Sequence, residues 1–435
     1  MNSIITRIRE NRLLKTGVSY SLAVTLYSVV GMIVGFVSLR WLAPDVYGIW
    51  QSFTIIISYL PIFQLGIQSG LNLELPVMLG KGETKNANSI VSTGLFFAMA
   101  LSLLLMVLFI ICLLIILNKQ KPIEYVLGFT AVSIMAIVQC YRLHYIATYR
   151  SASAFNKLSL IYIISSFVNI FLIFFIYWIR YYGLLLYYVG SEIVATFLMW
   201  RSAPYRSLRP SFSFNCFKQL FKRGIFMTFV NQIIGVIESL PKLMLLKYGG
   251  VFQVGLFAPA LAIGTIINLI PSQIVQFLQP QFGYRYGQTG MAIDMWKYLK
   301  KITFIMPICI LPVSLLLWVL MPFLLEFLFP KYLESLLAIR ILLIGFSFSS
   351  GFITRSFLIT IKAYKEVIVL YLIDLALFIS LPFALISLTN YPIIVNMSLG
   401  MTISYVISYI LTYMIAGITI KQPIYNRPNP TSINK

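Results

Sequence analysis

Long apolar runs follow one another along almost the whole chain, separated by short polar or basic connectors. Each run is long enough to cross the hydrocarbon core of a bilayer as a helix. The pattern predicts twelve membrane-spanning helices. They are expected at residues 17–39, 47–69, 89–117, 124–148, 157–179, 183–200, 224–246, 254–278, 302–326, 337–361, 366–388 and 393–418.

One basic stretch interrupts this pattern near the middle of the chain. Residues 201–223 hold six Lys or Arg residues, two prolines and no acidic residue, which predicts a solvated loop. The chain after the loop repeats its beginning, because a shift of 207 residues places Gly17 on Gly224 without a gap. The same shift places Gly48 on Gly255. A duplicated membrane protein is the expected organisation.

Six spans in each half return the chain to the side from which it entered. The two halves therefore have the same orientation, and they can face each other across a central cavity. The predicted fold is an all-α polytopic membrane protein with two parallel six-helix halves around that cavity. Its predicted parts are an N-terminal half at 1–200, a basic cytoplasmic linker at 201–223 and a C-terminal half with a short cytoplasmic tail at 224–435.

Composition supports the membrane assignment and excludes other classes. Hydrophobic residues make up 60% of the chain, charged residues make up 10%, and the mean hydropathy is +0.90, which is too apolar for a soluble protein of this length. The net charge of +21 is spread through short loops, so we expect no nucleic-acid partner. None of the four cysteines has the spacing of a zinc site or a disulfide framework, and no metal is expected.

The distribution of cations predicts the orientation in the membrane. Of the 33 Lys and Arg residues, 23 fall on the side of the N-terminus, six fall on the opposite side and four fall within predicted spans. Cytoplasmic loops carry the excess of Lys and Arg in membrane proteins. Both termini and the central loop are therefore expected in the cytoplasm.

Few ionisable residues lie inside the spans, where each is costly unless it faces a partner or water. The candidate substrate-binding residues are Arg142, Lys242 and Arg355, and the candidate ion-coupling or charge-balancing residues are Glu192, Glu238 and Asp374. Glu238 precedes Lys242 by four residues on one helix face, which favours an ion pair. For the three cations, the alternative is that they extend to lipid headgroups. His144 is the only histidine, and an interfacial hydrogen-bonding role is commoner for such a residue than proton relay.

Residues 39–50, LRWLAPDVYGIW, together with Leu65, Gly66, Gly70 and the Gly-Lys-Gly at 80–82, resemble the N-terminal signature of the Wzx-type polysaccharide flippases. These belong to the multidrug/oligosaccharidyl-lipid/polysaccharide exporter superfamily. The resemblance implies a transporter, not an enzyme, that moves a polyprenyl-diphosphate-linked oligosaccharide from the cytoplasmic to the outer leaflet by alternating access.

The same resemblance implies a role in O-antigen, and hence lipopolysaccharide, or capsular polysaccharide assembly. It places the protein in a bacterial plasma membrane, the inner membrane in a Gram-negative cell. The implied partners are the polyprenyl-diphosphate-linked glycan, membrane lipids and other polysaccharide-assembly membrane proteins, and no cofactor is implied. Where many relatives carry an Asp followed by a base in the seventh span, this chain has Pro241 and Lys242.

Two other functions stay open. A drug/cation antiporter of the same superfamily would share the architecture, but it would use an acidic cavity, whereas four Lys or Arg and three deep carboxylates lie in the spans here. A membrane-embedded glycosyl polymerase or ligase would present a sizeable outer loop, and connectors such as 390–392 are only a few residues long. No GxxxxGK[ST] motif is present, so the sequence encodes no P-loop for an ATP-driven pump.

Overall fold

The structure is a computed structural model that describes the backbone of residues 2–426; the side chains of residues 2–18 and of several positions between 270 and 287 fall outside the description. Within residues 2–426 it contains helices, turns and one isolated β-bridge between Met291 and Asn426, and no strand. The all-α prediction is confirmed. A backbone inside a bilayer must satisfy its own hydrogen bonds, and a helix does so within one segment.

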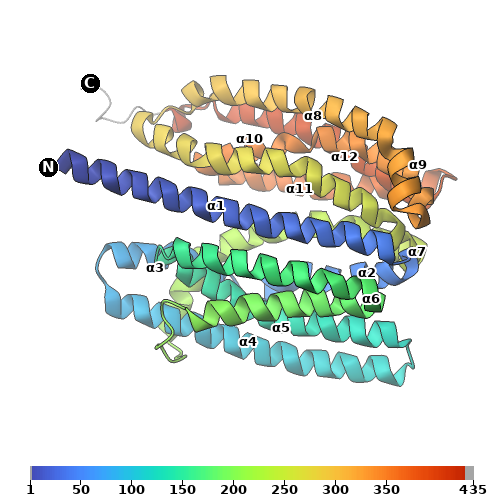
Figure 1. The fold of residues 1–435 in the computed structure, drawn as a ribbon. Coiled ribbons are helices and arrows are strands. Elements are labelled where there is room, and N and C mark those ends of the chain that lie inside the picture. The colour runs from blue at the N-terminus through green and yellow to red at the C-terminus, as the bar shows by residue number, and fades with distance from the viewer. Residues whose placement is uncertain (1, 427–435) are drawn as a thin grey trace. The chain divides into compact units, whose positions relative to one another are not determined.

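The chain forms two compact units, Met1–Gly235 and Val236–Lys435. In the first, α1 packs on α6, α6 on α5 and α5 on α4 (Figure 1). The start of α7 completes this unit. Its helices are α1 (Asn2–Trp41), α2 (Pro44–Phe63), α3 (Ile67–Gly80), α4 (Thr84–Asn118), α5 (Ile123–Ser151), α6 (Phe155–Arg201) and the first part of α7 (Phe214–Thr289).

The second unit contains the rest of α7 and the elements that follow it. Helix α12 packs on both α11 and α9, and α9 packs on α8. The elements are α8 (Ala292–Leu328), η1 (Pro330–Ser335), α9 (Leu336–Ser347), η2 (Ser349–Gly351), α10 (Phe352–Thr360), α11 (Tyr364–Leu388), α12 (Ile393–Thr419) and η3 (Pro423–Tyr425).

Ten helical segments in the described part of the chain are long and apolar enough to cross a membrane, and two of them are long enough to cross twice. Helix α6 has 47 residues, about 70 Å at 1.5 Å per residue. Its helical backbone is broken at Arg180, and a Cβ atom at Gly183 would lie only 2.1 Å from the Phe175 carbonyl oxygen. Residues eight apart can meet in this way only where the chain turns back, so α6 is a helical hairpin between the predicted spans 157–179 and 183–200.

Helix α7 is broken at Gly250, where φ is 75°, between the predicted spans 224–246 and 254–278. The first break of the chain lies at Ala43, between α1 and α2. These two positions are 207 residues apart, the same shift that relates the two halves of the sequence. The division between the compact units falls at Gly235, inside α7, so residues 224–235 pack with the first unit.

Two predicted spans are not single helices. The span predicted at 47–69 is broken between α2 and α3, where Leu65 and Gly66 have φ values of 48° and 76°. The span predicted at 337–361 is divided into α9, η2 and α10. Hydropathy does not reveal these breaks because the residues that form them are as apolar or small as their neighbours.

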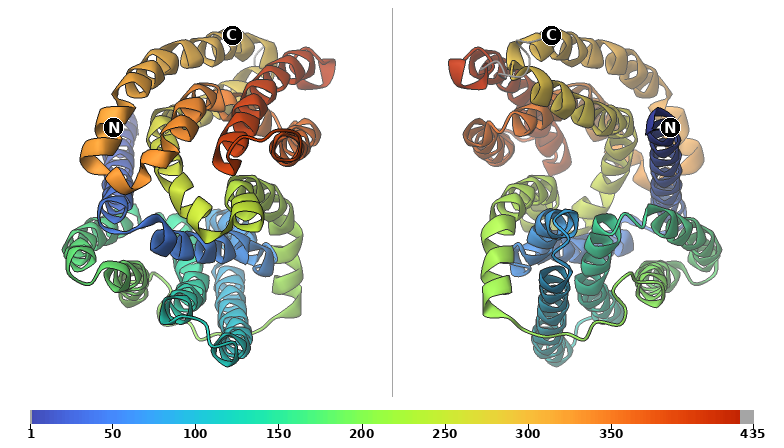
Figure 2. Two further views of the ribbon diagram at one scale, coloured as in Figure 1. Left: turned by 90° about the vertical axis from the view of Figure 1, so that its right-hand side faces the viewer. Right: turned by 90° about the vertical axis from the view of Figure 1, so that its left-hand side faces the viewer.

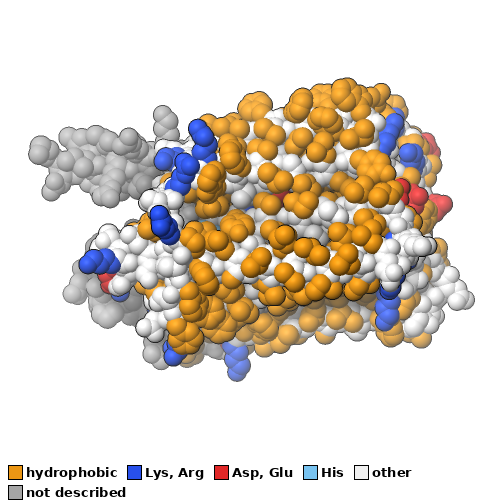
Figure 3. All heavy atoms as spheres, turned by 90° about the horizontal axis from the view of Figure 1, so that it is seen from below, with side chains coloured by type: hydrophobic (Ala, Val, Ile, Leu, Met, Phe, Trp, Pro, Cys, Tyr) orange, Lys and Arg blue, Asp and Glu red, His pale blue; other side chains and the backbone are white. Residues whose placement is uncertain are grey.

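Hydrophobic side chains cover the middle of the face drawn in Figure 3, and the Lys and Arg side chains on it lie toward the ends of the helices. Helix α4 contributes strongly to such a surface, since Leu103 and Leu104 are 64% and 54% exposed. Exposed leucines in long rows are the expected lipid-facing surface of a spanning helix. The protein is a multi-pass membrane protein.

Candidate functional site

The first unit brings together two of the predicted site residues. Arg142 on α5 forms an ion pair with Glu192 on α6, with 3.0 Å between Nε and Oε2. Their side chains are 18% and 15% exposed, so the pair lies inside the unit yet keeps some access. Burial of the carboxylate without the arginine would leave a charge in a medium of low dielectric constant. The pair therefore stabilises both charges.

Polar side chains surround this ion pair. The charge of Arg142 acts on the hydroxyl of Tyr162, and the charge of Glu192 acts on that of Tyr187. Next to Glu192, the Ser191 hydroxyl lies 3.3 Å from that of Tyr27 on α1. Several buried polar atoms of this unit have no hydrogen-bond partner in the described protein: Gln64 Nε2, Gln68 Oε1, His144 Nδ1, Ser165 Oγ, Asn169 Oδ1 and Gln232 Oε1. Buried polar groups without protein partners are the usual place for water or a polar ligand.

The second unit contains a more enclosed ion pair. Arg355 on α10 and Asp374 on α11 are only 5% and 6% exposed. The guanidinium binds both carboxylate oxygens, with 3.1 Å between Nη2 and Oδ1 and a second contact from Nη1 to Oδ2. It also donates to Ser408 at 2.7 Å and to Thr412 at 2.9 Å, both on α12. The arginine thus joins three helices, and most of its N–H groups are already used.

Glu238 and Lys242 lie one turn apart on α7, in the same unit, and their charges attract each other. Glu238 is exposed and Lys242 is half-buried. Two tyrosines connect them to the enclosed pair: the charges of Glu238 and Asp374 both act on the hydroxyl of Tyr405, and the guanidinium carbon of Arg355 lies 5.0 Å from the ring centre of Tyr371. The second unit therefore gathers four of the six predicted site residues.

Each predicted cation thus has one predicted carboxylate beside it. The sequence predicted the neighbours Glu238 and Lys242, which share a helix, but it could not pair residues from different helices. It also missed the hydroxyls of Ser408 and Thr412, although their spacing of four residues places them on one face of a helix. Whether these residues bind a substrate remains a prediction.

One further carboxylate escaped the sequence analysis. Glu74 on α3 is buried and accepts from Arg223 Nε at 2.7 Å and from Gln219 Nε2 at 2.7 Å, both at the start of α7. The Ser69 and Thr228 hydroxyls lie 2.8 Å apart along the same contact. A carboxylate near a predicted cytoplasmic loop gave no signal of this role. These contacts fasten the start of α7 to α3.

Small residues let these two helices approach at backbone distance. A Cβ atom at Gly224 would lie 1.8 Å from the carbonyl oxygen of Gly66, and one at Gly70 would lie 2.1 Å from that of Leu220. The GxxxG pair at Gly31 and Gly35 has a spacing that lets helices approach closely, but no atom of the described residues lies within 4 Å of a Cβ added at either glycine. The close approach lies at the α3–α7 contact instead.

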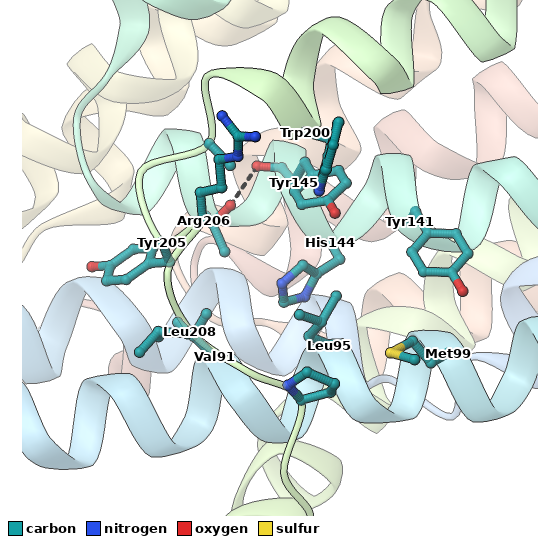
Figure 4. A pocket seen from close by; sticks show the side chains of 13 residues that line it. Val91, Leu95, Met99, Tyr141, His144, Tyr145, Trp200, Tyr205, Arg206 and Leu208 are labelled. Carbon is teal, nitrogen blue, oxygen red and sulfur yellow. Dashed lines mark hydrogen bonds between the residues drawn. The ribbon is translucent and has the colours of Figure 1, made fainter.

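A cavity of about 300 Å³ lies in the first unit, where α4, α5 and the end of α6 meet residues 203–210 (Figure 4). Its lining consists of Val91, Leu95, Met99, Tyr141, His144, Tyr145, Thr148, Trp200, Ala203, Tyr205, Arg206, Leu208 and Pro210. None of the six predicted site residues lines it. Among the described residues, no group of three His, Cys, Asp or Glu side chains is placed to hold a metal ion.

The model of a family described as polysaccharide biosynthesis protein matches residues 37–337, more than half of the chain. A comparison with curated protein sequences found no match. The chain resembles solved structures along almost its full length. With a multidrug resistance MATE family transporter of the MOP superfamily, in an inward-facing conformation, the TM-score is 0.77 at 15% identity, over 91% of this chain and 94% of that chain.

Two other structures show the same likeness. A MOP superfamily transporter from Pyrococcus furiosus, described as having a binding pocket of reversed polarity that suggests a different function, gives a TM-score of 0.65 at 14% identity, over 93% of this chain and 95% of that chain. A mutant of a Vibrio cholerae MATE transporter gives a TM-score of 0.60 at 13% identity, over 94% and 100%. The expected fold is confirmed by these structures. The chain belongs to the polysaccharide biosynthesis protein family and has the two-unit fold of a MATE transporter.

Proposed function

We propose that this protein is a flippase that moves a polyprenyl-diphosphate-linked oligosaccharide from the cytoplasmic to the outer leaflet of a bacterial plasma membrane. One observation carries the proposal: a chain of the polysaccharide biosynthesis family has the fold of a transporter. The glycan would serve O-antigen or capsule assembly. The protein would act by transport, with no catalytic residue.

The chemistry of such a substrate explains the intramembrane cations. A diphosphate loses its hydration when it enters hydrocarbon, which is costly. A positive surface open to water replaces part of the lost hydration. Arg142, Lys242 and Arg355 would supply this surface. Arg is suited to a diphosphate because its planar fork holds two oxygens at once and keeps its charge when partly desolvated.

The carboxylates beside these cations would act as exchangeable partners. Glu192 neutralises Arg142 in this structure, and protonation of Glu192 would free the arginine for a phosphate oxygen. Arg142 is the more available arginine, because its pair keeps 18% and 15% exposure, whereas Arg355 is 5% exposed and already bound to Asp374, Ser408 and Thr412. We therefore assign first contact with the diphosphate to Arg142 and Lys242, and a supporting role to the pair of Arg355 and Asp374.

Movement of the two units would give alternating access. Helix α7 begins in the first unit, held by Glu74 and the backbone contact with α3, and continues past Val236 into the second. Rocking of one half against the other would expose the cations first to the cytoplasm and then to the outer side.

The deciding experiment is the fate of the lipid-linked glycan in cells that lack this protein. A flippase predicts that the glycan accumulates in the cytoplasmic leaflet, which an impermeant reagent reaches only in inverted vesicles. Loss of a polymerase or ligase instead leaves the glycan in the outer leaflet, where the reagent reaches it in right-side-out vesicles. Unchanged glycan in both preparations would reject a role in its translocation.

A drug/cation antiporter is the second candidate, since one of the most similar structures is that of a multidrug resistance transporter. The predicted cations argue against a cationic substrate. The Pyrococcus furiosus transporter, with its pocket of reversed polarity, is a precedent for the same fold with another polarity. Cation-dependent efflux of a fluorescent drug by reconstituted protein, with no change in glycan distribution, would favour the antiporter.

A further inference from the structure

The cavity of the first unit has walls of two different kinds. Its floor on α4 is apolar and contains Val91 and Leu95, while its other walls carry Tyr145, Trp200 and Tyr205. Figure 4 shows the linker chain, with Tyr205 and Leu208, running past the α4 and α5 side chains so that it closes one side. A space of about 300 Å³ accommodates a phosphate with a small alcohol such as glycerol.

A buried histidine that carries an unpaired polar atom lines this space. His144 on α5 lines the cavity, is 2% exposed, and its Nδ1 has no hydrogen-bond partner in the described protein. Such an atom costs free energy unless a ligand or water pairs with it. Figure 4 places the ring between Leu95 and Tyr145, at the centre of the group. The cavity is therefore built to hold a polar ligand.

One cationic side chain, that of Arg206, lies at the edge of the cavity. The Arg206 guanidinium carbon lies 4.9 Å from the ring centre of Trp200, and Nη1 donates to the Arg201 carbonyl oxygen at 3.2 Å. These two contacts hold the planar group beside the cavity while leaving other N–H groups available. Residues 201–223 carry six cations and no acid, so the surroundings favour an anion.

The apolar wall of the cavity continues into the lipid-facing side of α4. Met99 lines the cavity and is 43% exposed, and Leu103, one turn further along α4, is 64% exposed. An acyl chain can lie along this row while its headgroup enters the cavity. A sugar or a free nucleotide would have no use for that row. The ligand that fits both parts is amphipathic and anionic.

We propose that this cavity binds the phosphate headgroup of an anionic membrane lipid, with an acyl chain along the exposed face of α4. Arg206 pairs with the phosphate, His144 hydrogen-bonds the headgroup, and Trp200 lies at the headgroup level. Basic clusters beside spanning helices bind anionic lipids in this way. The site is separate from the six predicted substrate residues and does not depend on the transported glycan.

Such a lipid would fix the central linker. The Ser211 amide donates to the Ser92 carbonyl oxygen at 3.4 Å, and the rings of Phe212 and Phe96 lie 5.5 Å apart, so the linker already rests on the start of α4. In Figure 2 this linker passes from α6 to the start of α7. A headgroup held between Arg206 and α5 adds one more attachment. Anionic lipid would then stabilise the packing of the linker against the first unit.

The test uses full-length purified protein and phosphatidylglycerol with brominated acyl chains, which quench nearby tryptophan. Trp178 and Trp318 are also exposed and would be quenched by either lipid, so the signal of interest is the part of the quenching that Trp200→Phe removes. We expect that part to be saturable with phosphatidylglycerol and small with brominated phosphatidylcholine. Arg206→Gln should weaken phosphatidylglycerol binding about fivefold, whereas Arg209→Gln should change it less than about twofold, because it removes an equal charge from a linker residue that does not line the cavity. Equal weakening by both substitutions, or equal binding of both lipids, would reject the site.

A second variant tests the cavity itself. Ala203→Phe places a ring in the space from the linker and should abolish the saturable quenching while the midpoint of thermal unfolding stays within about 3 °C. Inorganic phosphate is the competing probe: at millimolar concentration it should leave lipid binding unchanged if the acyl chain contributes. Displacement of the lipid by phosphate would mean an anion site without lipid selectivity, and preserved quenching in Ala203→Phe would place the lipid elsewhere. Either result overturns the proposal.

Discussion

Arg142 Nε lies 3.0 Å from Glu192 Oε2, so α5 and α6 are joined by two charges that neutralise each other. The pair is partly exposed, unlike that of Arg355 and Asp374. Exposure matters because a charge that keeps contact with water can exchange its partner at little cost, whereas a fully buried pair loses several kcal/mol when it opens. The two arginines should therefore respond differently to substitution.

Substitution of Arg142 should impair transport more than folding. Arg142→Gln keeps the length of the side chain and removes the charge, so we expect glycan export to fall about tenfold or more, the loss of one charge-assisted hydrogen bond. Arg150→Gln is the matched control, because Arg150 is exposed on the same helix and donates only to the Tyr20 hydroxyl among its described contacts. Export is measured at equal membrane levels of protein. Equal export by both variants would exclude Arg142 from substrate binding.

Substitution of Arg355 should destabilise the protein first. Arg355→Met leaves the buried carboxylate of Asp374 unpaired, which costs roughly 3–5 kcal/mol. The double variant Arg355→Met with Asp374→Leu removes both charges and should recover most of the lost stability in thermal unfolding. Its export activity then decides the role of the pair. Normal export by the double variant would show that the pair has a structural role alone. If the double variant is no more stable than Arg355→Met, the ion-pair explanation is wrong.

Hydropathy predicted most of the fold because each spanning helix must be apolar along about 20 residues. The predicted connectors near Ala43, Arg180 and Gly250 coincide with breaks in the helices. The breaks at Leu65 and within η2 could not be predicted, since they depend on backbone angles that apolar composition does not encode. These three predicted connectors therefore match helix breaks, but two of the predicted spans were too regular.

The candidate site was predictable only as a set of residues. Charge inside a span marks Arg142 and Asp374, because burial of either is costly. Which charge meets which is decided by the packing of helices from distant parts of the chain, and one sequence contains no record of that. Glu74 was missed because it lies beside a predicted loop, where a carboxylate is ordinary. The close contact of α7 with α3 at Gly66 and Gly224 could not be predicted from the sequence, because it depends on how the two helices pack.

The backbone contact between α3 and α7 should tolerate no side chain. Gly70→Ala places a Cβ atom 2.1 Å from the Leu220 carbonyl oxygen, which is too close for two atoms in contact, so we expect a loss of roughly 1–3 kcal/mol in unfolding free energy. Gly31→Ala is the control, because no atom of the described residues lies within 4 Å of its added Cβ and alanine favours a helix by about 0.5–1 kcal/mol. Thermal unfolding in detergent measures both. If Gly70→Ala leaves the unfolding free energy unchanged, the close contact between α3 and α7 does not contribute to stability.

The orientation of the chain rests on its cations and can be tested at two positions. A reporter fused within residues 207–215 lies in the central linker, beside cations that cannot readily leave the cytoplasm, and should report a cytoplasmic location. The connector at 390–392, between α11 and α12, has no cation and should report the outer side. Green fluorescent protein, active inside, and alkaline phosphatase, active outside, give opposite signals at each position.

Two outcomes would contradict this prediction. If both signals are reversed, the predicted orientation is wrong, and the proposed outward direction of transport is wrong as well. If both positions report the same side, the number of crossings between the linker and α12 is wrong, because five crossings separate the two sites in the predicted topology.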